Sequence, residues 1–309
     1  MLEINGKTRI CGIFGYPVEH SFSPAMHNAA FKDMGLNYAY VPFAVRPEDL
    51  AGAVSSIRHL NLAGVNVTVP HKQAVAGLVD LLSPAARLAG AVNTIVDSGG
   101  VLTGHNTDGM GFVRSLEEEA GTEIASGPAL IIGAGGAARA VAVALALNGA
   151  PALFITNRTR EKAADLCELI NNNTGCRASV LGWPKPGQQG GEGWVEALGA
   201  AAFMVQTTSM GMHPNTVEFP PVPFNLLNKG QVAVDLIYNP GRTAFMKLCE
   251  AAGCRVFNGI GMLLHQGVMA FELWTGRTPP VDVMREALRR CLEGRMQNAE
   301  IFLPKIDTY

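Results

Sequence analysis

The first third of the chain alternates short apolar strands with helical stretches. Ser23-Pro24 marks the start of one helix, because serine is a favoured N-cap and proline fits the first helical turn. The apolar run Gly64–Val69 stops at Pro70 and is typical of a strand. The pattern predicts strands over Arg9–Gly15, Tyr38–Val45 and Gly64–Val69, helices over Ala25–Met34 and Pro47–His59, and a hairpin of Ala91–Val96 with Val101–Thr103.

From about Gly109 the pattern changes to a β-α-β unit. Ala129–Ile132 is apolar at every position, as expected for a parallel strand that is buried on both faces. A helix over Ala137–Leu147 and a strand over Leu153–Thr156 complete the unit. The other predicted elements are helices over Phe112–Ala120, Glu161–Asn171, Ala244–Ala252 and Val281–Arg295, and strands over Phe203–Gln206, Val232–Asp235 and Arg255–Phe257. The alternation predicts an α/β fold.

The stretch from Ala129 to Ile155 is apolar enough to raise the alternative of a membrane span. It contains Arg139 and Asn148, and its small residues 133–136 are typical of a turn. A buried strand, a turn and a buried helix therefore fit better. The N-terminal segment MLEINGKTRI has no apolar signal core, so no membrane is expected as a partner.

Composition narrows the class of protein. A length of 309 residues suggests two domains. The net charge of −2 argues against binding to nucleic acid, which normally needs a basic excess. The six cysteines form no C-x-x-C pair and no Cys/His cluster with zinc-ligand spacing. We therefore expect a reduced, cytoplasmic protein without a metal site.

The segment Gly133-Ala134-Gly135-Gly136-Ala137 follows a predicted strand and opens a helix. Small residues there let the backbone approach a pyrophosphate, and the helix N-terminus offers free N–H groups. The alternative is a tight turn without a ligand. The next strand ends at Asn157-Arg158-Thr159, where an NAD-binding protein usually has Asp or Glu. Because a guanidinium pairs with a 2′-phosphate, Arg158 favours NADP, unless it is only a solvated surface charge.

Polar side chains of the first domain form a second group. Ser23 is expected to cap its helix, with Ser21 two residues before it. Asn66 and Thr68 share one face of a strand. Lys72 follows at a predicted helix start, where a lysine opposes the helix dipole, which argues against a merely structural role. Lys72 and Asp108, beside an interdomain cleft, would suit acid–base chemistry on an alcohol or a carbonyl.

Seven motifs together resemble the shikimate dehydrogenase family, and they run in that family's order. The motifs are Gly12-x-x-Gly15-x-Pro17-x-x-His20-Ser21-x-Ser23-Pro24-x-x-His27-Asn28, Asn66-Val67-Thr68-Val69-Pro70-His71-Lys72, Gly90-Ala91-Val92-Asn93-Thr94, Asn106-Thr107-Asp108-Gly109, Gly133-Ala134-Gly135-Gly136-Ala137, Asn157-Arg158-Thr159 and Asn258-Gly259-x-Gly261-Met262-Leu263-x-His265-Gln266. The resemblance implies an N-terminal α/β substrate domain, residues 1–108 plus 263–309. It also implies a Rossmann-type NADP-binding domain, residues 109–262, with a cleft between the two domains.

The resemblance further implies the reversible, NADP(H)-dependent reduction of 3-dehydroshikimate to shikimate, a step of aromatic amino-acid biosynthesis. Lys72 and Asp108 would be the catalytic pair. Residues implied to bind the substrate are Ser21, Ser23, Asn66, Thr68, Asn93, Tyr238 and Gln266. Residues implied to bind NADP(H) are Gly133, Ala134, Gly135, Gly136, Ala137, Asn157, Arg158, Thr159, Gly259 and Met262. We expect a monomer or a homodimer whose partner is the small-molecule substrate.

Three departures from the family and two alternatives accompany this interpretation. Gln206 stands where the family more often has Asn, which would alter a contact on the cofactor side. The segment 182–193 is longer than usual, and either Arg160 or Lys162 would be the second basic residue at the 2′-phosphate. One alternative is a quinate/shikimate dehydrogenase with broader substrate or cofactor use. The other is a catalytically silent dinucleotide sensor, which would have no need of the catalytic pair.

Overall fold

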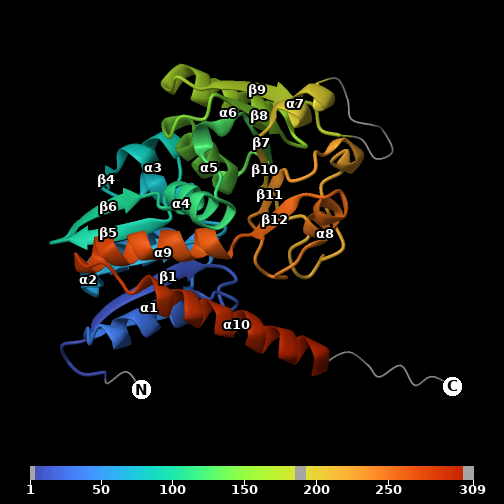
Figure 1. Cartoon of the computed structure of the whole chain (residues 1–309). Helices are drawn as coiled ribbons and strands as arrows, with labels where there is room; N and C mark the ends of the chain where they lie inside the picture. The colour runs from blue at the N-terminus through green and yellow to red at the C-terminus, as the bar shows by residue number, and fades with distance from the viewer. Residues whose placement is uncertain (1–3, 185–192, 302–309) are drawn as a thin grey trace.

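Two six-stranded sheets organise the chain, and helices lie on both faces of each (Figure 1). The computed structural model describes residues 4–184 and 193–301. The first sheet comes from the N-terminal third of the chain and the second from residues 129–258. The predicted α/β fold, with a Rossmann-type sheet following an N-terminal α/β part, is confirmed.

The first sheet mixes parallel and antiparallel pairs in the order β2-β1-β3-β5-β6-β4. Its strands are β1 (Arg9–Gly15), β2 (Tyr38–Ala44), β3 (Gly64–Val67), β4 (Leu81–Leu82), β5 (Thr94–Ser98) and β6 (Val101–His105). The predicted hairpin is present, since β5 and β6 pair antiparallel with Ser98 opposite Val101. One face is covered by α2 (Leu50–His59), α3 (Pro84–Ala89) and the 3-10 turns Pro47–Asp49 and Ala74–Gly77.

The second sheet is entirely parallel, in the order β12-β11-β10-β7-β8-β9. Its strands are β7 (Ala129–Ile132), β8 (Ala152–Thr156), β9 (Arg177–Leu181), β10 (Phe203–Gln206), β11 (Val232–Asp235) and β12 (Arg255–Asn258). This is the doubly wound order of dinucleotide-binding folds, with the strand sequence reversing between β7 and β10. Ligands of such sheets bind outside the carboxyl ends of the strands, next to that reversal.

The register of the second sheet gathers its carboxyl-end loops at one edge. Ile132, the last residue of β7, pairs with Thr156 of β8 and Gln206 of β10. Gln206 in turn pairs with Asp235 of β11, which pairs with Asn258 of β12. All five strands therefore end level, and the segments that follow them emerge side by side.

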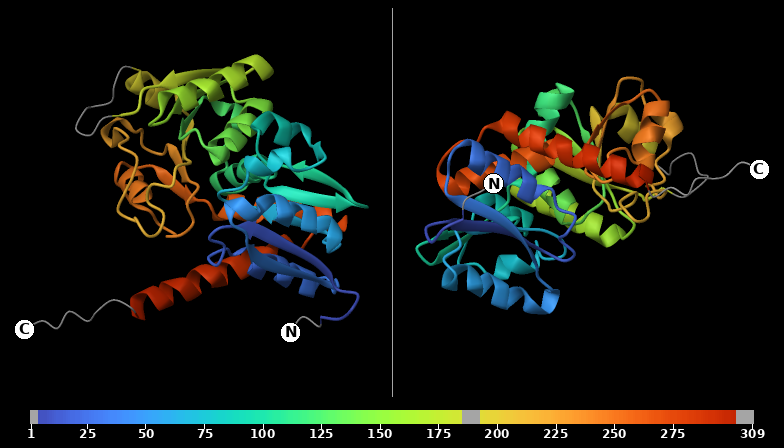
Figure 2. Two further views of the ribbon diagram at one scale, coloured as in Figure 1. Left: turned by 180° about the vertical axis from the view of Figure 1, so that it is seen from behind. Right: turned by 90° about the horizontal axis from the view of Figure 1, so that it is seen from below.

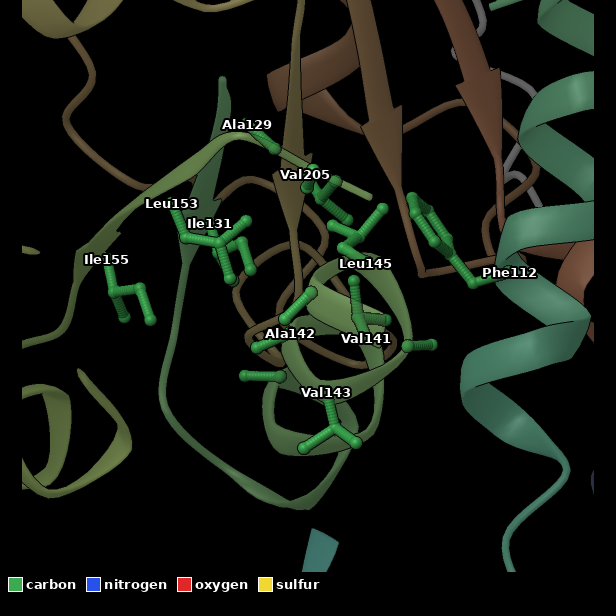
Figure 3. Close-up of a cluster of buried hydrophobic side chains, with 14 of the residues drawn as sticks. Phe112, Ala129, Ile131, Val141, Ala142, Val143, Leu145, Leu153, Ile155 and Val205 are labelled. Carbon is green, nitrogen blue, oxygen red and sulfur yellow. The ribbon is translucent and has the colours of Figure 1, made fainter. Parts of the chain in front are cut away.

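Two helical layers enclose the second sheet. One face carries α4 (Asp108–Ala120), α5 (Gly136–Leu147) and α6 (Arg160–Asn173), and the other carries α7 (Trp194–Ala200) and α8 (Ala244–Ala251). Figure 3 shows side chains of α5 beside those of β7 and β8, with Phe112 of α4 approaching from the neighbouring helix. This continuous apolar core fixes the start of α5 against the end of β7.

After β12 the chain returns to the first sheet. Helices α9 (Ile260–Thr275) and α10 (Val281–Ile301) pack with α1 (Ser23–Asp33) on the face opposite α2. Phe271 stacks on Phe31 with ring centroids 4.8 Å apart, and Trp274 Nε1 donates to the Ile95 carbonyl at 3.0 Å. A Cβ at Gly64 would lie 2.4 Å from Trp274 Nε1, so this close packing requires glycine in β3. The far end of α10 extends beyond the body of the molecule (Figure 2).

Local expectations fail at two positions. Phe22, not Ser23, is the N-cap of α1, and no side chain caps that helix. Lys72 lies in a turn that leads into the short 3-10 turn Ala74–Gly77 rather than at the start of an α-helix. Of the predicted long loop 182–193, residues 185–192 lie outside the described residues. Within the described ranges, no helix combines the length and apolar character that a membrane span requires.

Candidate active site

Lys72 and Asp108 form an ion pair, with Lys72 Nζ 2.7 Å from Asp108 Oδ2. Asp108 is the first residue of α4, and Lys72 comes from the turn after β3. The Asp108 side chain is 6% exposed and that of Lys72 is 23% exposed. The pair is therefore held by buried structure on the carboxylate side and is reachable from solvent on the amine side.

Three hydrogen bonds fix the turn that carries Lys72. The Thr68 amide donates to the Phe14 carbonyl at 2.9 Å, and the Val92 amide donates to the Lys72 carbonyl at 2.7 Å. His71 is buried, and its Nε2 lies 2.7 Å from the Val45 carbonyl oxygen. The turn at Lys72 is thus tied to β1 and to the segments that flank β2 and β5.

Asn93 connects the pair to other predicted site residues. Its Nδ2 donates its two hydrogens to Asp108 Oδ1 and Thr107 Oγ1, each at 2.9 Å, and also lies 3.3 Å from Gln266 Oε1. Its Oδ1 accepts from the Thr107 amide at 2.8 Å. All four residues are buried. Because buried polar groups need partners, this network restricts each side chain to one orientation.

Asn66 joins the same network from β3. Its Nδ2 donates to Thr94 Oγ1 at 3.0 Å and to the Asn93 carbonyl at 3.2 Å, and its Oδ1 accepts from the Tyr40 hydroxyl at 2.7 Å. Thr68, two residues on, lies over Gly15, where a Cβ would come within 2.4 Å of Thr68 Cγ2. Glycine at that end of β1 leaves the space that Thr68 occupies.

Ser21, Ser23 and Tyr238 meet at the start of α1. Ser21 Oγ accepts from the Ser23 amide at 3.3 Å. Between the two serines, Phe22 contacts the Tyr238 ring at a centroid distance of 5.4 Å. Tyr238 belongs to the loop after β11, so this contact joins the two halves of the molecule. The structure therefore brings Tyr238 next to the segment that carries the predicted substrate-binding residues Ser21 and Ser23.

A buried carboxylate holds the loop that carries Tyr238. Asp235 is fully buried and accepts from the Ile237 amide at 3.0 Å and from Thr243 Oγ1 at 2.6 Å. Burial raises the pKa of Asp235 to about 6. The two carboxylate oxygens of Asp235 thus hold both ends of the loop that carries Tyr238.

Gln266 reaches the network from α9 because two helices approach closely. A Cβ at Gly111 of α4 would lie 2.7 Å from the Gln266 amide nitrogen. Gln266 Nε2 also donates to the Leu263 carbonyl at 2.8 Å, which aims its Oε1 at Asn93.

The segment 133–137 has the shape that a pyrophosphate requires. Gly133 has a φ of +119°, and a Cβ there would lie 2.3 Å from Thr207 Oγ1. A Cβ at Gly135 or Gly136 would meet nothing within 4 Å, so the space over the start of α5 is open. α5 begins at Gly136 without a side-chain cap. Its first N–H groups are thus available to a phosphate, and Ala134 and Ala137 keep the turn small.

Asn157, Arg158 and Thr159 follow β8 next to this turn. Asn157 Nδ2 donates to the Thr159 carbonyl at 2.8 Å and closes the turn, while Arg158 is exposed. Since Thr156 pairs with Ile132, the exposed guanidinium belongs to the same sheet edge as Gly133. A dinucleotide with an extra phosphate on its ribose fits this arrangement.

The remaining predicted residues on the cofactor side have structural contacts of their own. A Cβ at Gly259 would lie 2.0 Å from the Leu236 carbonyl oxygen, so packing alone requires glycine there. Met262 is half-buried, and its carbonyl lies against Gly111. Gln206 is fully buried, and its Nε2 donates to the carbonyls of Thr208 at 3.2 Å and Met210 at 3.1 Å. These hydrogen bonds from Gln206 therefore hold the loop after β10 in its conformation.

In the described part of the chain, no three His, Cys, Asp or Glu side chains lie together as a metal site would require. The histidines that the sequence contains have other surroundings. His27 is fully buried between aromatic rings, and burial lowers its pKa to about 3. His265 Nε2 lies 2.8 Å from Glu118 Oε2 on α4.

Three family models match successive parts of the chain. One, described as the shikimate dehydrogenase substrate binding domain, matches residues 13–95. A second, described as shikimate / quinate 5-dehydrogenase, matches residues 115–179. The third, described as the shikimate 5′-dehydrogenase C-terminal domain, matches residues 259–289.

Whole-length relatives agree with these matches. A shikimate dehydrogenase (NADP(+)) of Desulforamulus reducens is 53% identical over 288 residues, which cover 93% of this chain and 97% of the relative. The crystal structure of shikimate 5-dehydrogenase from Listeria monocytogenes in complex with shikimate and NAD has a TM-score of 0.85 and 38% identity, covering 92% of this chain and 98% of that one. The enzyme of Thermus thermophilus, in complex with NADP(H) and shikimate, has a TM-score of 0.80 and 38% identity, covering 92% and 100%.

Proposed function

The chain belongs to the shikimate dehydrogenase family, and we propose that Lys72 and Asp108 are the residues with which it performs that family's reaction. The reaction is the reversible, NADP-dependent reduction of 3-dehydroshikimate to shikimate. The observation that carries the assignment is the 2.7 Å ion pair between Lys72 and Asp108, which Asn93 ties to Gln266.

The chemistry needs one hydride and one proton. When bound, NADPH supplies the hydride that reaches the carbonyl carbon. The Lys72 ammonium donates its proton to the carbonyl oxygen as negative charge develops there, and its positive charge stabilises that oxygen. In the oxidative direction, the neutral Lys72 amine accepts the hydroxyl proton. Because its side chain is 23% exposed, Lys72 exchanges that proton with solvent between turnovers.

Asp108 acts on both partners of this proton transfer. Its Oδ2 orients the Lys72 ammonium, and Asn93 holds its Oδ1. With the carboxylate fixed in this way, Lys72 Nζ is held at one position beside the hydrogen-bond network of Asn93. The proposal places a hydroxyl of the substrate at that position. Preorganised charges of this kind cost no rearrangement during the reaction.

The substrate has one carboxylate and several ring hydroxyls, and the site offers matching groups. Ser21, Ser23 and Tyr238 supply hydroxyls for the carboxylate at the start of α1. Neutral amide and hydroxyl groups suit a polyol because each can donate or accept. The residues assigned to the ring hydroxyls are Asn66, Thr68, Asn93, Asp108 and Gln266.

The dinucleotide occupies the carboxyl edge of the second sheet in this proposal. The open turn Gly133–Ala137 receives the pyrophosphate, and Arg158 with Asn157 and Thr159 receives the 2′-phosphate. Gly259 and Met262 border the nicotinamide end. Residues 1–108 plus 263–309 form the substrate domain and residues 109–262 the NADP-binding domain, in line with the return of α9 to the first sheet.

The cellular setting is part of the proposal as well. We place the reaction in aromatic amino-acid biosynthesis, in the cytoplasm, with a monomer or homodimer as the active species. Five cysteines are buried free thiols, which suits a reducing compartment; they are Cys11, Cys167, Cys176, Cys249 and Cys254.

A panel of two substrates and two cofactors tests the function. The purified protein should reduce NADP⁺ with shikimate far faster than NAD⁺ with shikimate, as followed by absorbance of the reduced cofactor. Quinate is the second substrate, because one matching family model covers shikimate and quinate enzymes. Equal rates with quinate would move the assignment to a broader quinate/shikimate dehydrogenase. Turnover with neither substrate would overturn it.

A further inference from the structure

Tyr40 is a buried phenol held rigidly in the middle of β2. Its exposed fraction is 1%, and its ring stacks on His27 with centroids 4.5 Å apart and planes at 14°. The Trp274 ring packs against the Tyr40 ring as well, with centroids 5.9 Å apart. Asn28 fixes the backbone, since its Oδ1 accepts from the Tyr40 amide at 2.8 Å and its Nδ2 donates to the Tyr40 carbonyl at 2.9 Å. The hydroxyl therefore has one position.

The direction of the hydrogen bonds at this hydroxyl follows from its neighbours. Asn66 Nδ2 donates to the Asn93 carbonyl, so the atom facing Tyr40 at 2.7 Å is the acceptor Oδ1. The phenol is thus the donor to Asn66. The side chain of Ser23 is its other hydrogen-bond partner. Burial raises the pKa of Tyr40 well above its ordinary value, which keeps the proton on the phenol.

From Tyr40 a chain of hydrogen bonds leads to the catalytic carboxylate. Asn66 Nδ2 donates to Thr94 Oγ1 at 3.0 Å, Thr94 donates to Asn93 Oδ1 at 3.2 Å, and Asn93 Nδ2 donates to Asp108 Oδ1 at 2.9 Å. Every member is buried. All donors point the same way, towards the carboxylate of Asp108, and such aligned bonds strengthen one another.

We propose that Tyr40 is a positioning residue of the substrate site, whose hydroxyl fixes the side chains of Asn66 and Ser23. This inference rests on the proposed function, in which both of those residues contact the substrate. It also specifies how Asn66 acts. Both of its amide hydrogens are engaged within the protein, so Asn66 can only accept a hydrogen bond, from a ring hydroxyl, at the second lone pair of Oδ1.

Tyr40→Phe tests the proposal because it removes the hydroxyl and keeps the stacked ring. We expect the KM for shikimate to rise about fivefold to tenfold, the usual effect of one lost hydrogen bond in a buried site. kcat should change less, and the KM for NADP⁺ should stay the same. The matched control is Tyr38→Phe on the same strand, whose hydroxyl accepts from Arg9 Nη1 at 2.8 Å in an exposed position. It should leave both constants unchanged.

A double-mutant cycle separates positioning from general stability. Asn66→Ala should raise the KM for shikimate, and adding Tyr40→Phe to it should raise the KM by less than the product of the two single effects. Thermal shift with shikimate gives binding without turnover. A Tyr40→Phe protein that melts earlier but keeps its KM, or effects that multiply independently, would overturn the role of Tyr40. If Asn66→Ala itself leaves KM unchanged, the proposed place of Asn66 in the site fails, and the role of Tyr40 fails with it.

Discussion

Replacing Lys72 with methionine removes the one mobile proton of the proposed reaction while keeping most of the side-chain stem. If Lys72 protonates the developing alkoxide, kcat should fall about 10²–10⁴-fold, the usual contribution of general acid–base catalysis. That range corresponds to about 3–5 kcal/mol of transition-state stabilisation. A lysine that only bound substrate would instead raise KM and spare kcat.

The structure sets the cost of the same change to folding. Breaking a fully buried ion pair by removing one partner costs about 3–5 kcal/mol. The Lys72 side chain is 23% exposed, and Asp108 keeps its bond from Asn93 at 2.9 Å. We therefore expect Lys72→Met to lower the free energy of unfolding by a smaller amount, about 1–3 kcal/mol, because the rest of the domain core stays intact. The drop in kcat should exceed what partial unfolding could produce.

Steady-state reduction of NADP⁺ by shikimate measures kcat and KM, and fluorescence titration measures NADP affinity. NADP binding should survive, because the turn at Gly133 belongs to the other sheet. Lys247→Met on α8 is the matched control, since that lysine is exposed and far along the chain from the pair. Asp108→Asn should also lower kcat, and the double variant should lose less than the product of both. A Lys72→Met enzyme with near-normal kcat and normal NADP binding would remove Lys72 from the mechanism.

Three further predictions follow from single contacts. Arg158→Ala should weaken NADP binding by about 1.5–3 kcal/mol and leave NAD binding nearly unchanged, and equal losses by titration would reject its pairing with the 2′-phosphate. Ser21→Ala and Ser23→Ala should each raise the KM for shikimate about tenfold, because each removes one hydrogen bond to the substrate carboxylate; an unchanged KM in steady-state kinetics would contradict this. His27 has an ordinary pKa of 6.5 that burial lowers to about 3, so as pH falls below 6.5 the unfolded chain gains the proton first and native stability declines. Denaturant unfolding of His27→Phe between pH 7 and about 4 should show a flatter decline than the parent, by up to about 1.4 kcal/mol per pH unit, and parallel profiles would show that His27 is not the cause.

Where hydrophobic pattern and burial coincide, the sequence predicted the fold well. β7 is apolar at all four positions because both faces are covered, and its predicted bounds match the structure. β9 escaped prediction because it is an edge strand, Arg177–Leu181, whose first four positions alternate between exposed and half-buried and whose last residue alone is buried. α7 is short, contains Gly199 and follows a glycine-rich segment, so it gives no helical signal of its own.

The candidate site was predictable where a local motif carried the chemistry, and it was missed where only packing did. Lys72 and Asp108 stand in polar motifs that predicted them as a pair, and the structure places their charged atoms 2.7 Å apart. Tyr40 lies in β2, and a tyrosine in an apolar strand indicates only a strand, so nothing local points to its bond with Asn66. Gln266 lies 173 residues from Asn93 along the chain, and the resemblance to a known family, not any pattern of residues, connected the two.

Helix α4 shows what positions the carboxylate of Asp108, which we propose as catalytic. A Cβ at Gly109 would lie 2.4 Å from the Ala140 carbonyl of α5, and one at Gly111 would lie 2.7 Å from the Gln266 amide of α9. Right after Asp108, α4 therefore touches the backbone of both neighbouring helices, with no space for a side chain at either contact. Since α5 starts at the turn proposed to bind the dinucleotide and α9 carries Gln266, one helix sets the position of Asp108 relative to both. Close helix packing thus accounts for the glycine that follows Asp108.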